Sequence, residues 1–303
     1  MSESVRDFSV AEHSEGVWSG AARRFISRRP GKIGLAIVLF FVLVALIGPV
    51  LLPFDFTNVA RPDQIVYAGR PPSLAHPFGE TGGLQRDVLT LVVNGARTSL
   101  FIGFTVTAAT IVIGVLIGAT AGYLGGVVDG LLMRLVDVML SLPTLFVILI
   151  VTRFFSSGSG DNVWTLIGVF TVFGWMGIAR LVRSGVLVIR DADYVEVMRI
   201  AGLGRLRIIV RHVLPNALGP VFAIAPLVLA GTIVGEAFIS YLGFGVSPTT
   251  PTWGNILSNA LGFLRNGNWW WPLFPGLCIF AVSLGANLVG EALRDALEPR
   301  SRR

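Results

Sequence analysis

Long stretches without a charged residue dominate this sequence. Residues 33–53 and 98–122 contain no Asp, Glu, Lys or Arg. Each is close to the ~20 apolar residues that a helix needs to cross a bilayer. Backbone polar groups must be paired inside lipid, which favours helices. Only 14% of the 303 residues are charged, against about a quarter in soluble proteins, so the sequence predicts one all-α integral membrane domain.

The apolar pattern predicts about six membrane-spanning helices. We expect them near residues 33–53, 98–122, 139–155, 163–181, 218–241 and 273–293. The second span carries Gly114 and Gly118, a pair of small residues four apart that permits close contact with another helix. The third span has Pro143 in its first turns and Arg153 near its end, where a long basic side chain can reach the interface.

The distribution of basic residues predicts the orientation. With the N-terminus inside, the inner segments hold 18 Lys and Arg residues and the outer segments hold 6. Cytoplasmic loops of membrane proteins carry such an excess. We therefore expect both termini in the cytoplasm and an even number of spans.

The same pattern divides the chain into five parts. They are a cytoplasmic N-terminal segment (1–32), a first transmembrane helix (33–53), an extracytoplasmic loop (54–94), a transmembrane domain with five helices (95–293) and a cytoplasmic tail (294–303). Within the first part, Trp18 and Phe25 lie at helical spacing among arginines, which fits a short helix on the membrane surface. A basic flank of the first span fits equally well, and both interpretations stay open.

Several other classes of function are disfavoured. The single Cys278 can form no internal disulfide, and the three His are too far apart for metal-ligand spacing. The basic residues lie in loops between apolar spans, which argues against nucleic-acid binding. The only Lys, Lys32, is followed by Ile33, so the chain has no standard P-loop for ATP. We expect no cofactor, metal or catalytic site in this chain.

The inner segment 190–216 carries the strongest functional signal. Its first part has the i, i+3, i+4, i+7 spacing of an amphipathic helix, at Tyr194, Val197, Met198 and Ala201. Asp191 or Asp193 can cap the start of this helix, and Gly202 and Gly204 can end it.

A second amphipathic pattern follows in the same segment. Its apolar positions are Leu206, Ile209, Val210 and Val213. Pro215 is expected to end this helix. One of the two apolar stripes can pack on the protein's own spans, and the other needs a soluble partner, for which a groove is the usual host. An amphipathic hairpin lying on lipid is the alternative.

This segment resembles the "EAA" loop of ATP-binding-cassette importer permeases. The resemblance rests on Tyr194-Val195-Glu196, on Gly202, and on the stretch from Arg211 to Asn216. In that family the loop is a coupling helix that sits in a cleft of the ATPase subunit. The two alanines after the Glu are here Val197 and Met198, which is a departure. The resemblance implies coupling to the ATPase by Tyr194, Glu196, Val197, Met198, Ala201 and Gly202.

Further motifs are similar to the dipeptide and oligopeptide permeases. They are His76-Pro77-Phe78-Gly79, the stretches 86–89, 95–100, 121–129, 133–137 and 142–143, and Ser240 to Val246 with Pro251 to Asn255. The resemblance covers residues 31–297, in the family order, and fits the second permease of the pair. The stretch 80–85 departs from the family because it is longer and has Gln85 where a Gly is common.

The resemblance implies a type I ABC importer transmembrane domain in the cytoplasmic membrane of a prokaryote. The implied partners are a homologous permease, two ATPase domains that bind ATP and Mg, and an extracytoplasmic peptide-binding protein. The implied cargo is a di- or oligopeptide, while nickel and other small solutes are carried by close relatives.

Two residues in the fifth span are candidates for the transport pathway, Glu236 and Ser240. An ionisable group inside a span is a functional candidate, although a structural Glu near the interface fits as well. The alternative function is a proton- or ion-driven secondary carrier. Such carriers have buried carboxylates near the midplane and often inverted repeats, and the sequence shows neither.

Overall fold

The computed structural model describes residues 17–53, 69–83, 86–155, 163–247 and 249–297. Regular structure in these ranges is helical, apart from isolated bridge residues such as the pair Glu80 and Asp87. In chain order the helices are α1 (Val17–Ser27), α2 (Arg29–Leu51), α3 (Val88–Leu124), α4 (Gly126–Ser141), α5 (Thr144–Phe155), α6 (Val163–Arg190), α7 (Asp193–Ile200), α8 (Arg205–Ile208), a π-helical turn (Ile209–Val213), α9 (Leu214–Ala217), α10 (Gly219–Tyr241), α11 (Trp253–Leu264) and α12 (Trp270–Leu297).

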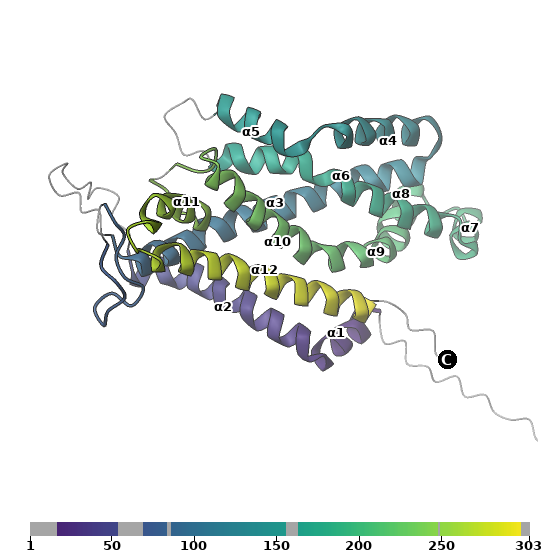
Figure 1. Cartoon of the computed structure of the whole chain (residues 1–303). Helices are drawn as coiled ribbons and strands as arrows, with labels where there is room; N and C mark the ends of the chain where they lie inside the picture. Colours follow the sequence, from purple (N-terminus) through teal and green to yellow (C-terminus); the bar gives the residue numbers. More distant parts are fainter. Residues whose placement is uncertain (1–16, 54–68, 84–85, 156–162, 248, 298–303) are drawn as a thin grey trace, which may run out of the picture.

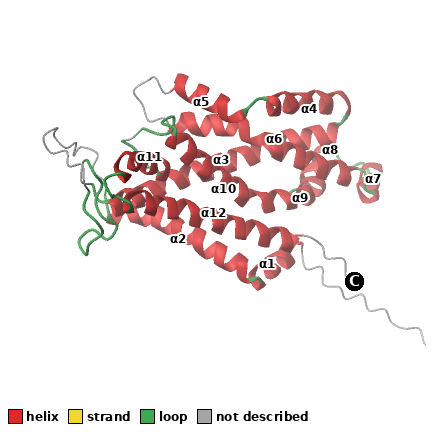
Figure 2. Ribbon diagram, viewed as in Figure 1, coloured by secondary structure: helices red, strands yellow, loops and turns green. Residues whose placement is uncertain are grey.

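Five long helices form the body of the molecule, namely α2, α3, α6, α10 and α12. Each is long and apolar enough to cross a membrane. They run along one common direction, with α7 to α9 at one end and α11 at the other (Figures 1 and 2). The predicted all-α membrane fold is therefore confirmed.

The third predicted span, 139–155, is wrong as a single straight helix. α4 ends at Ser141 and α5 begins at Thr144, and the two are bent by 82°. Pro143 explains the break, because it lacks an N–H and drives the preceding residue out of the helical region. Leu142 is accordingly extended, with φ −75° and ψ 137°. The pair counts as a sixth span only if its two halves cross together.

Three helices extend beyond the predicted limits. α3 begins at Val88 because Asp87 caps it, its carboxylate accepting a hydrogen bond from the Thr90 N–H at 2.8 Å. Residues 88–94, predicted as loop, are therefore helical, and residues 54–68 of that loop lie outside the described part. α6 continues past residue 181 to Arg190, and α12 includes residues 294–297 of the predicted tail.

The most extensive helix pairing joins α3 to α6. Gly114, Gly118 and Gly122 form one stripe on α3. A Cβ at Gly118 would lie 2.3 Å from the carbonyl oxygen of Ala179, and one at Gly122 would lie 2.9 Å from that of Arg183. The two backbones are thus in direct contact, which confirms the predicted role of the small residues.

A buried tryptophan fixes the end of the bundle that carries α11. The Trp253 Nε1–H donates to the carbonyl oxygen of Val92 at 3.0 Å, and its ring meets that of Phe41 edge-on at 5.6 Å between centroids. Thr252 and Asn255 form a capping box at the start of α11. The sequence analysis did not predict this helix, which joins α2 and α3 here.

Of the two interpretations of the N-terminal segment, the short helix is present as α1. Arg28 forms an ion pair with Asp295, and the Arg24 guanidinium donates to the carbonyl oxygen of Ala296 at 3.1 Å. These contacts hold α1 on the C-terminal end of α12. Both lie at the same end of the bundle as α7 (Figure 1).

Gly118→Ala should destabilise the protein by about 1–3 kcal/mol, because the added methyl forces α3 and α6 apart. Gly177→Ala on α6 is the matched control, since nothing lies within 4 Å of its added methyl. It should be neutral or slightly stabilising, as Ala favours a helix over Gly. Thermal unfolding of the purified chain in detergent, followed by circular dichroism, measures both. Equal midpoints for the two variants would contradict direct backbone contact.

Candidate functional site

The start of α7 lacks a side-chain cap. Ala192 precedes the first turn and neither aspartate caps it, so the predicted cap by Asp191 or Asp193 is wrong. Asp191 instead accepts a hydrogen bond from Arg190 Nε at 3.0 Å. This bond holds the pKa of the Asp191 carboxyl below its usual range. Asp193 lies in the first turn, where its charge favours the positive end of the helix.

The end of α7 is a left-handed glycine turn. Gly202 has φ +79°, a conformation that costs other residues about 1–2 kcal/mol. The Leu203 N–H donates to the Met198 carbonyl at 3.1 Å, and the Gly202 N–H donates to the Arg199 carbonyl at 3.0 Å. These two bonds make a Schellman motif. The predicted end of the helix at Gly202 is confirmed.

The predicted end of the second helix at Pro215 is wrong. α8, the π-helical turn and α9 follow one another without interruption. Within them the Leu214 N–H donates to the carbonyl oxygen of Ile209, five residues earlier. This wider turn accommodates Pro215, which has no N–H to contribute. The segment therefore continues into α10.

One face of α7 packs on the protein's own core. Val195 is fully buried in the cluster that contains Ile208 and Val213. Met198 is partly buried and packs against the same cluster. Met198 therefore faces inward, which disagrees with its predicted place in the stripe that contacts a partner.

The opposite face of α7 is apolar and exposed. Tyr194 is 44% exposed, Val197 64% and Ile200 80%. Residues three apart are neighbours on a helix, so these three side chains form one surface, which we call the α7 outer face. The other predicted coupling residues, Glu196, Ala201 and Gly202, are exposed as well.

Two arginines connect this loop to the C-terminal end of α3. Arg190 Nη1 donates to the carbonyl oxygen of Gly122 at 2.9 Å. The guanidinium of Arg199 lies 5.9 Å above the ring of Tyr123, a distance at which a cation attracts an aromatic face. The sequence analysis missed both links, because their partners lie more than 60 residues away in the chain.

The described parts of the chain contain no group of three or more His, Cys, Asp or Glu placed to hold a metal ion. The loop offers an exposed apolar surface on a backbone held by the Gly202 turn and by arginine contacts. Such an arrangement suits protein–protein contact.

Glu236 and Ser240 lie in the protein interior. They are 1% and 4% exposed. Ser240 Oγ donates to Glu236 Oε1 at 2.7 Å, and Ser99 Oγ lies 3.4 Å from Oε2. The Trp253 N–H donates to Ser99 Oγ at 3.1 Å. The network joins α10, α3 and α11, so this placement gives both residues a structural role and does not fit the predicted lining of a pathway.

Glu236→Leu should destabilise the protein by about 1–3 kcal/mol, because the buried hydroxyls of Ser99 and Ser240 lose their acceptor. Glu236→Gln keeps an acceptor oxygen and should cost less. Thermal unfolding of the purified chain, with hydrogen exchange at the amides of α11, measures the difference. Equal stability of the Leu and Gln variants would contradict the network.

Two family matches cover most of the chain. Residues 114–303 match the family described as "Binding-protein-dependent transport system inner membrane component". Residues 16–72 match the "N-terminal TM domain of oligopeptide transport permease C". The chain belongs to the family of binding-protein-dependent transport system inner membrane components. It is therefore a membrane permease subunit.

Curated relatives are similar over nearly the whole length. The chain is 36% identical to the dipeptide transport system permease protein DppC of Bacillus subtilis, over 97% of this chain and 89% of that protein. It is 33% identical to the oligopeptide transport system permease protein OppC of the same species, over 97% and 93%. For OppC of Haemophilus influenzae the identity is 32%, over 99% and 94%.

A solved structure shows the same fold. One chain of the MetNI methionine ABC transporter, determined in inward facing conformations, aligns with a TM-score of 0.54 and 20% identity. The alignment covers 69% of this chain and 97% of that one. The predicted type I importer architecture is thereby confirmed at the level of the fold.

Proposed function

We propose that this chain is one of two permease subunits of an ATP-driven importer that carries di- or oligopeptides across the cytoplasmic membrane of a prokaryote. The observation that carries the proposal is the near full-length similarity to dipeptide and oligopeptide permeases. Nickel or another small solute is the alternative cargo. A proton- or ion-driven carrier is not favoured, since Glu236 is bound within a structural network.

The proposed assembly contains this chain, a homologous permease, two ATPase domains and an extracytoplasmic peptide-binding protein. The ATPase domains bind ATP and Mg, because this chain has no P-loop Lys. The chain itself is accordingly a pore-forming subunit and not an enzyme.

The α7 end of the bundle is the proposed cytoplasmic end. The excess of 18 basic residues over 6 supports this orientation. The contacts of Arg24 and Arg28 with the end of α12 put α1 and that end of α12 on the same side as α7. Both termini are then cytoplasmic, and α11 faces the outside.

The proposed contact with the ATPase is the α7 outer face. α7 has only eight residues, and an isolated helix of this length is not stable in water. It is held from inside by Val195, and its outer face remains available to a groove on the partner. Tyr194, Val197 and Ile200 then supply the apolar contact, with Glu196, Ala201 and Gly202 beside them.

The proposed mechanism links ATP to the membrane through α6. ATP binding draws the ATPase domains together, and α7 moves with its partner. α7 follows α6 after a short turn, and α6 is packed backbone to backbone on α3. Movement at α7 is therefore passed to α3 and α6 as one unit. ATP thus shifts the population between inward-open and outward-open states.

Val197→Ser should weaken assembly with the ATPase about ten- to a hundredfold. A fully buried Val side chain contributes about 1.5–3 kcal/mol, and each 1.4 kcal/mol is tenfold in affinity. The stability of the permease alone should hardly change, since Val197 is 64% exposed there. Co-purification of the ATPase at matched membrane levels measures assembly, and thermal unfolding measures the stability of the permease.

Val195→Ser is the matched control on the inner face. It should lower the unfolding midpoint of the permease itself, because Val195 is fully buried. Retention of the ATPase by Val197→Ser at the wild-type level would reject the α7 outer face as the contact.

Uptake in cells tests the cargo. Cells that lack only the gene for this chain, and retain the genes of its partners, should accumulate labelled di- and tetrapeptides and not labelled nickel when this chain is restored. Gly202→Val, which is strained at φ +79°, should abolish this uptake while the protein remains in the membrane. Uptake should stop when ATP is depleted and persist when a protonophore is added with ATP maintained. The reverse result would favour the secondary carrier.

A further inference from the structure

The first turn of α2 carries two basic side chains, those of Arg29 and Lys32. Both are exposed. Neither forms a hydrogen bond or an ion pair with another of the described residues. They are three residues apart in one helix, so they are neighbours on its surface. The function proposed above assigns no role to them.

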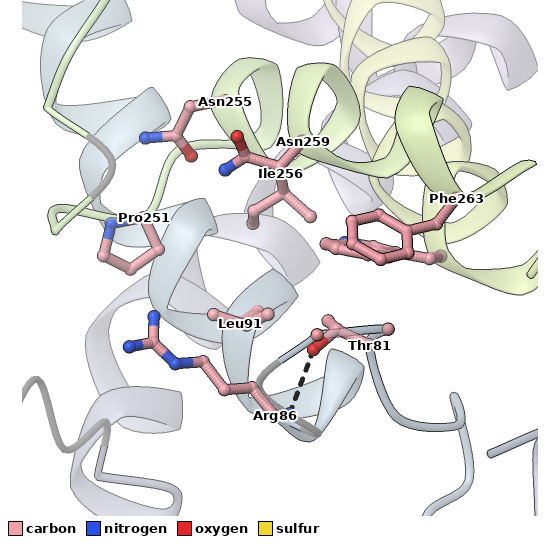
Figure 3. A pocket seen from close by; sticks show the side chains of 11 residues that line it. Thr81, Arg86, Leu91, Pro251, Asn255, Ile256, Asn259 and Phe263 are labelled. Atoms are coloured by element: carbon pink, nitrogen blue, oxygen red, sulfur yellow. Dashed lines mark hydrogen bonds between the residues drawn. The ribbon is translucent and has the colours of Figure 1, made fainter. Parts of the chain in front are cut away.

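Other arginines at the two ends of the bundle are engaged within the chain. Arg28, next to this turn, forms an ion pair with Asp295. At the opposite end Arg86 interacts with other residues of the chain and lies along the wall of a pocket, where its backbone N–H donates to Thr81 Oγ1 at 3.0 Å (Figure 3). The basic pair on α2 differs because its charges remain available to an anion from outside the chain.

The packing of α2 turns this basic pair away from the protein. A Cβ at Gly31 would lie 2.7 Å from that of Ala292, and one at Gly34 would lie 2.5 Å from an α12 carbonyl oxygen. The glycine side of α2 is therefore in close contact with α12. Counted at about 3.6 residues per turn, Arg29 lies on the side opposite to these glycines, with Lys32 beside it.

An exposed apolar stripe continues from the basic pair along α2. Its members recur three or four residues apart, as positions on one side of a helix do, and they are Ile33, Ala36, Phe40, Leu43, Ile47 and Val50. Helix–helix contacts in membranes favour small residues, such as those on the glycine side of α2. The stripe consists mainly of large apolar side chains, which suits it to the acyl chains of lipid.

The surroundings of the basic pair carry a net positive charge. Residues 17–32 hold five basic residues and no acidic residue. No side chain caps the start of α2, so the positive end of the helix adds to the attraction for an anion. Ile26 on the neighbouring helix α1 is 61% exposed, which places a further apolar side chain near these charges.

An anionic phospholipid matches both parts of this surface. The chain spans a membrane, so lipid headgroups meet α2 at its ends while acyl chains run along its length. Basic residues at the end of a span attract anionic headgroups. A soluble anion would leave the apolar stripe unfilled, and a zwitterionic lipid would offer no net charge to the basic pair.

We propose that Arg29 and Lys32 bind the headgroup of an anionic phospholipid whose acyl chain lies along the stripe from Ile33 to Val50. The site lies in the leaflet at the α1 end of the bundle, which is the cytoplasmic leaflet in the orientation proposed above. It depends on the membrane-spanning fold and not on the proposed cargo. The bound lipid holds the start of the first span at the membrane surface.

Native mass spectrometry of the full-length chain in a neutral detergent tests the site. The probes are phosphatidylglycerol and phosphatidylcholine with the same acyl chains, and the readout is the dissociation constant of the tightest binding step. The wild type should bind phosphatidylglycerol more tightly. Arg29→Gln combined with Lys32→Gln should weaken phosphatidylglycerol about five- to thirtyfold, since each basic residue near a membrane surface contributes about fivefold in affinity. Binding of phosphatidylcholine should hardly change.

Two control variants accompany this experiment. Arg207→Gln combined with Arg211→Gln removes two exposed basic side chains at the same end of the bundle but outside α2. Arg29→Lys combined with Lys32→Arg keeps both charges on α2. Both controls should bind phosphatidylglycerol like the wild type, and the second separates loss of charge from misfolding.

Four results would overturn the proposal. They are equal affinity of the wild type for the two lipids, unchanged phosphatidylglycerol binding by the double Gln variant of α2, equally weak binding by its charge-preserving counterpart, and displacement of the lipid by excess inorganic phosphate, which would indicate a site for free anions. Peptide uptake tests a separate claim, because its absence in cells with the wild type rejects the proposed cargo and not this site.

Discussion

Direct backbone contact between α3 and α6 is the constraint on which the rest of the structure depends. Lipid gives helices no hydrophobic reason to associate, so close packing of small residues has to hold them together. The glycine stripe brings α3 against the carbonyl oxygens of Trp175 and Ala179. Contacts at both ends of the bundle depend on this placement of α3 against α6. Arg190 at the end of α6 bonds to the last turn of α3, and Ser99 on α3 approaches Glu236.

The number and course of most spans could be predicted from the sequence, because about 20 residues without a charge have few other solutions. The residues at which the helices begin and end could not be predicted. α3 starts ten residues earlier than predicted because one carboxylate, that of Asp87, caps it. The prediction of the third span as one helix was wrong for a similar local reason. Pro143 forces the backbone of Leu142 out of the helical conformation, and the average hydropathy of the segment does not reveal this.

The predictions for the candidate site were likewise partly right and partly wrong. The sequence predicted a short helix in this loop and its end at Gly202. It did not predict which face of α7 is exposed. Five of the eight residues of α7 are apolar, so the pattern fits more than one face, and Met198 was placed outside although it packs inside. Glu236 was misjudged because Ser99, 137 residues away, decides its surroundings. Sequence periodicity does not contain such long-range partners.

α6 is held by different contacts toward α3 and toward α4. Toward α3 it has backbone packing, which is lost if the helices separate by even a small distance. Toward α4 it has a buried apolar cluster, in which Val136 packs with Trp175, Met176 and Ala179, and two ion pairs, Arg183 with Asp129 and Arg180 with Asp137. The Arg180–Asp137 pair is exposed and contributes at most about 1 kcal/mol, while the Arg183–Asp129 pair is partly buried. A pull on α6 therefore carries α3 with it, because the glycine stripe leaves no space between the two backbones.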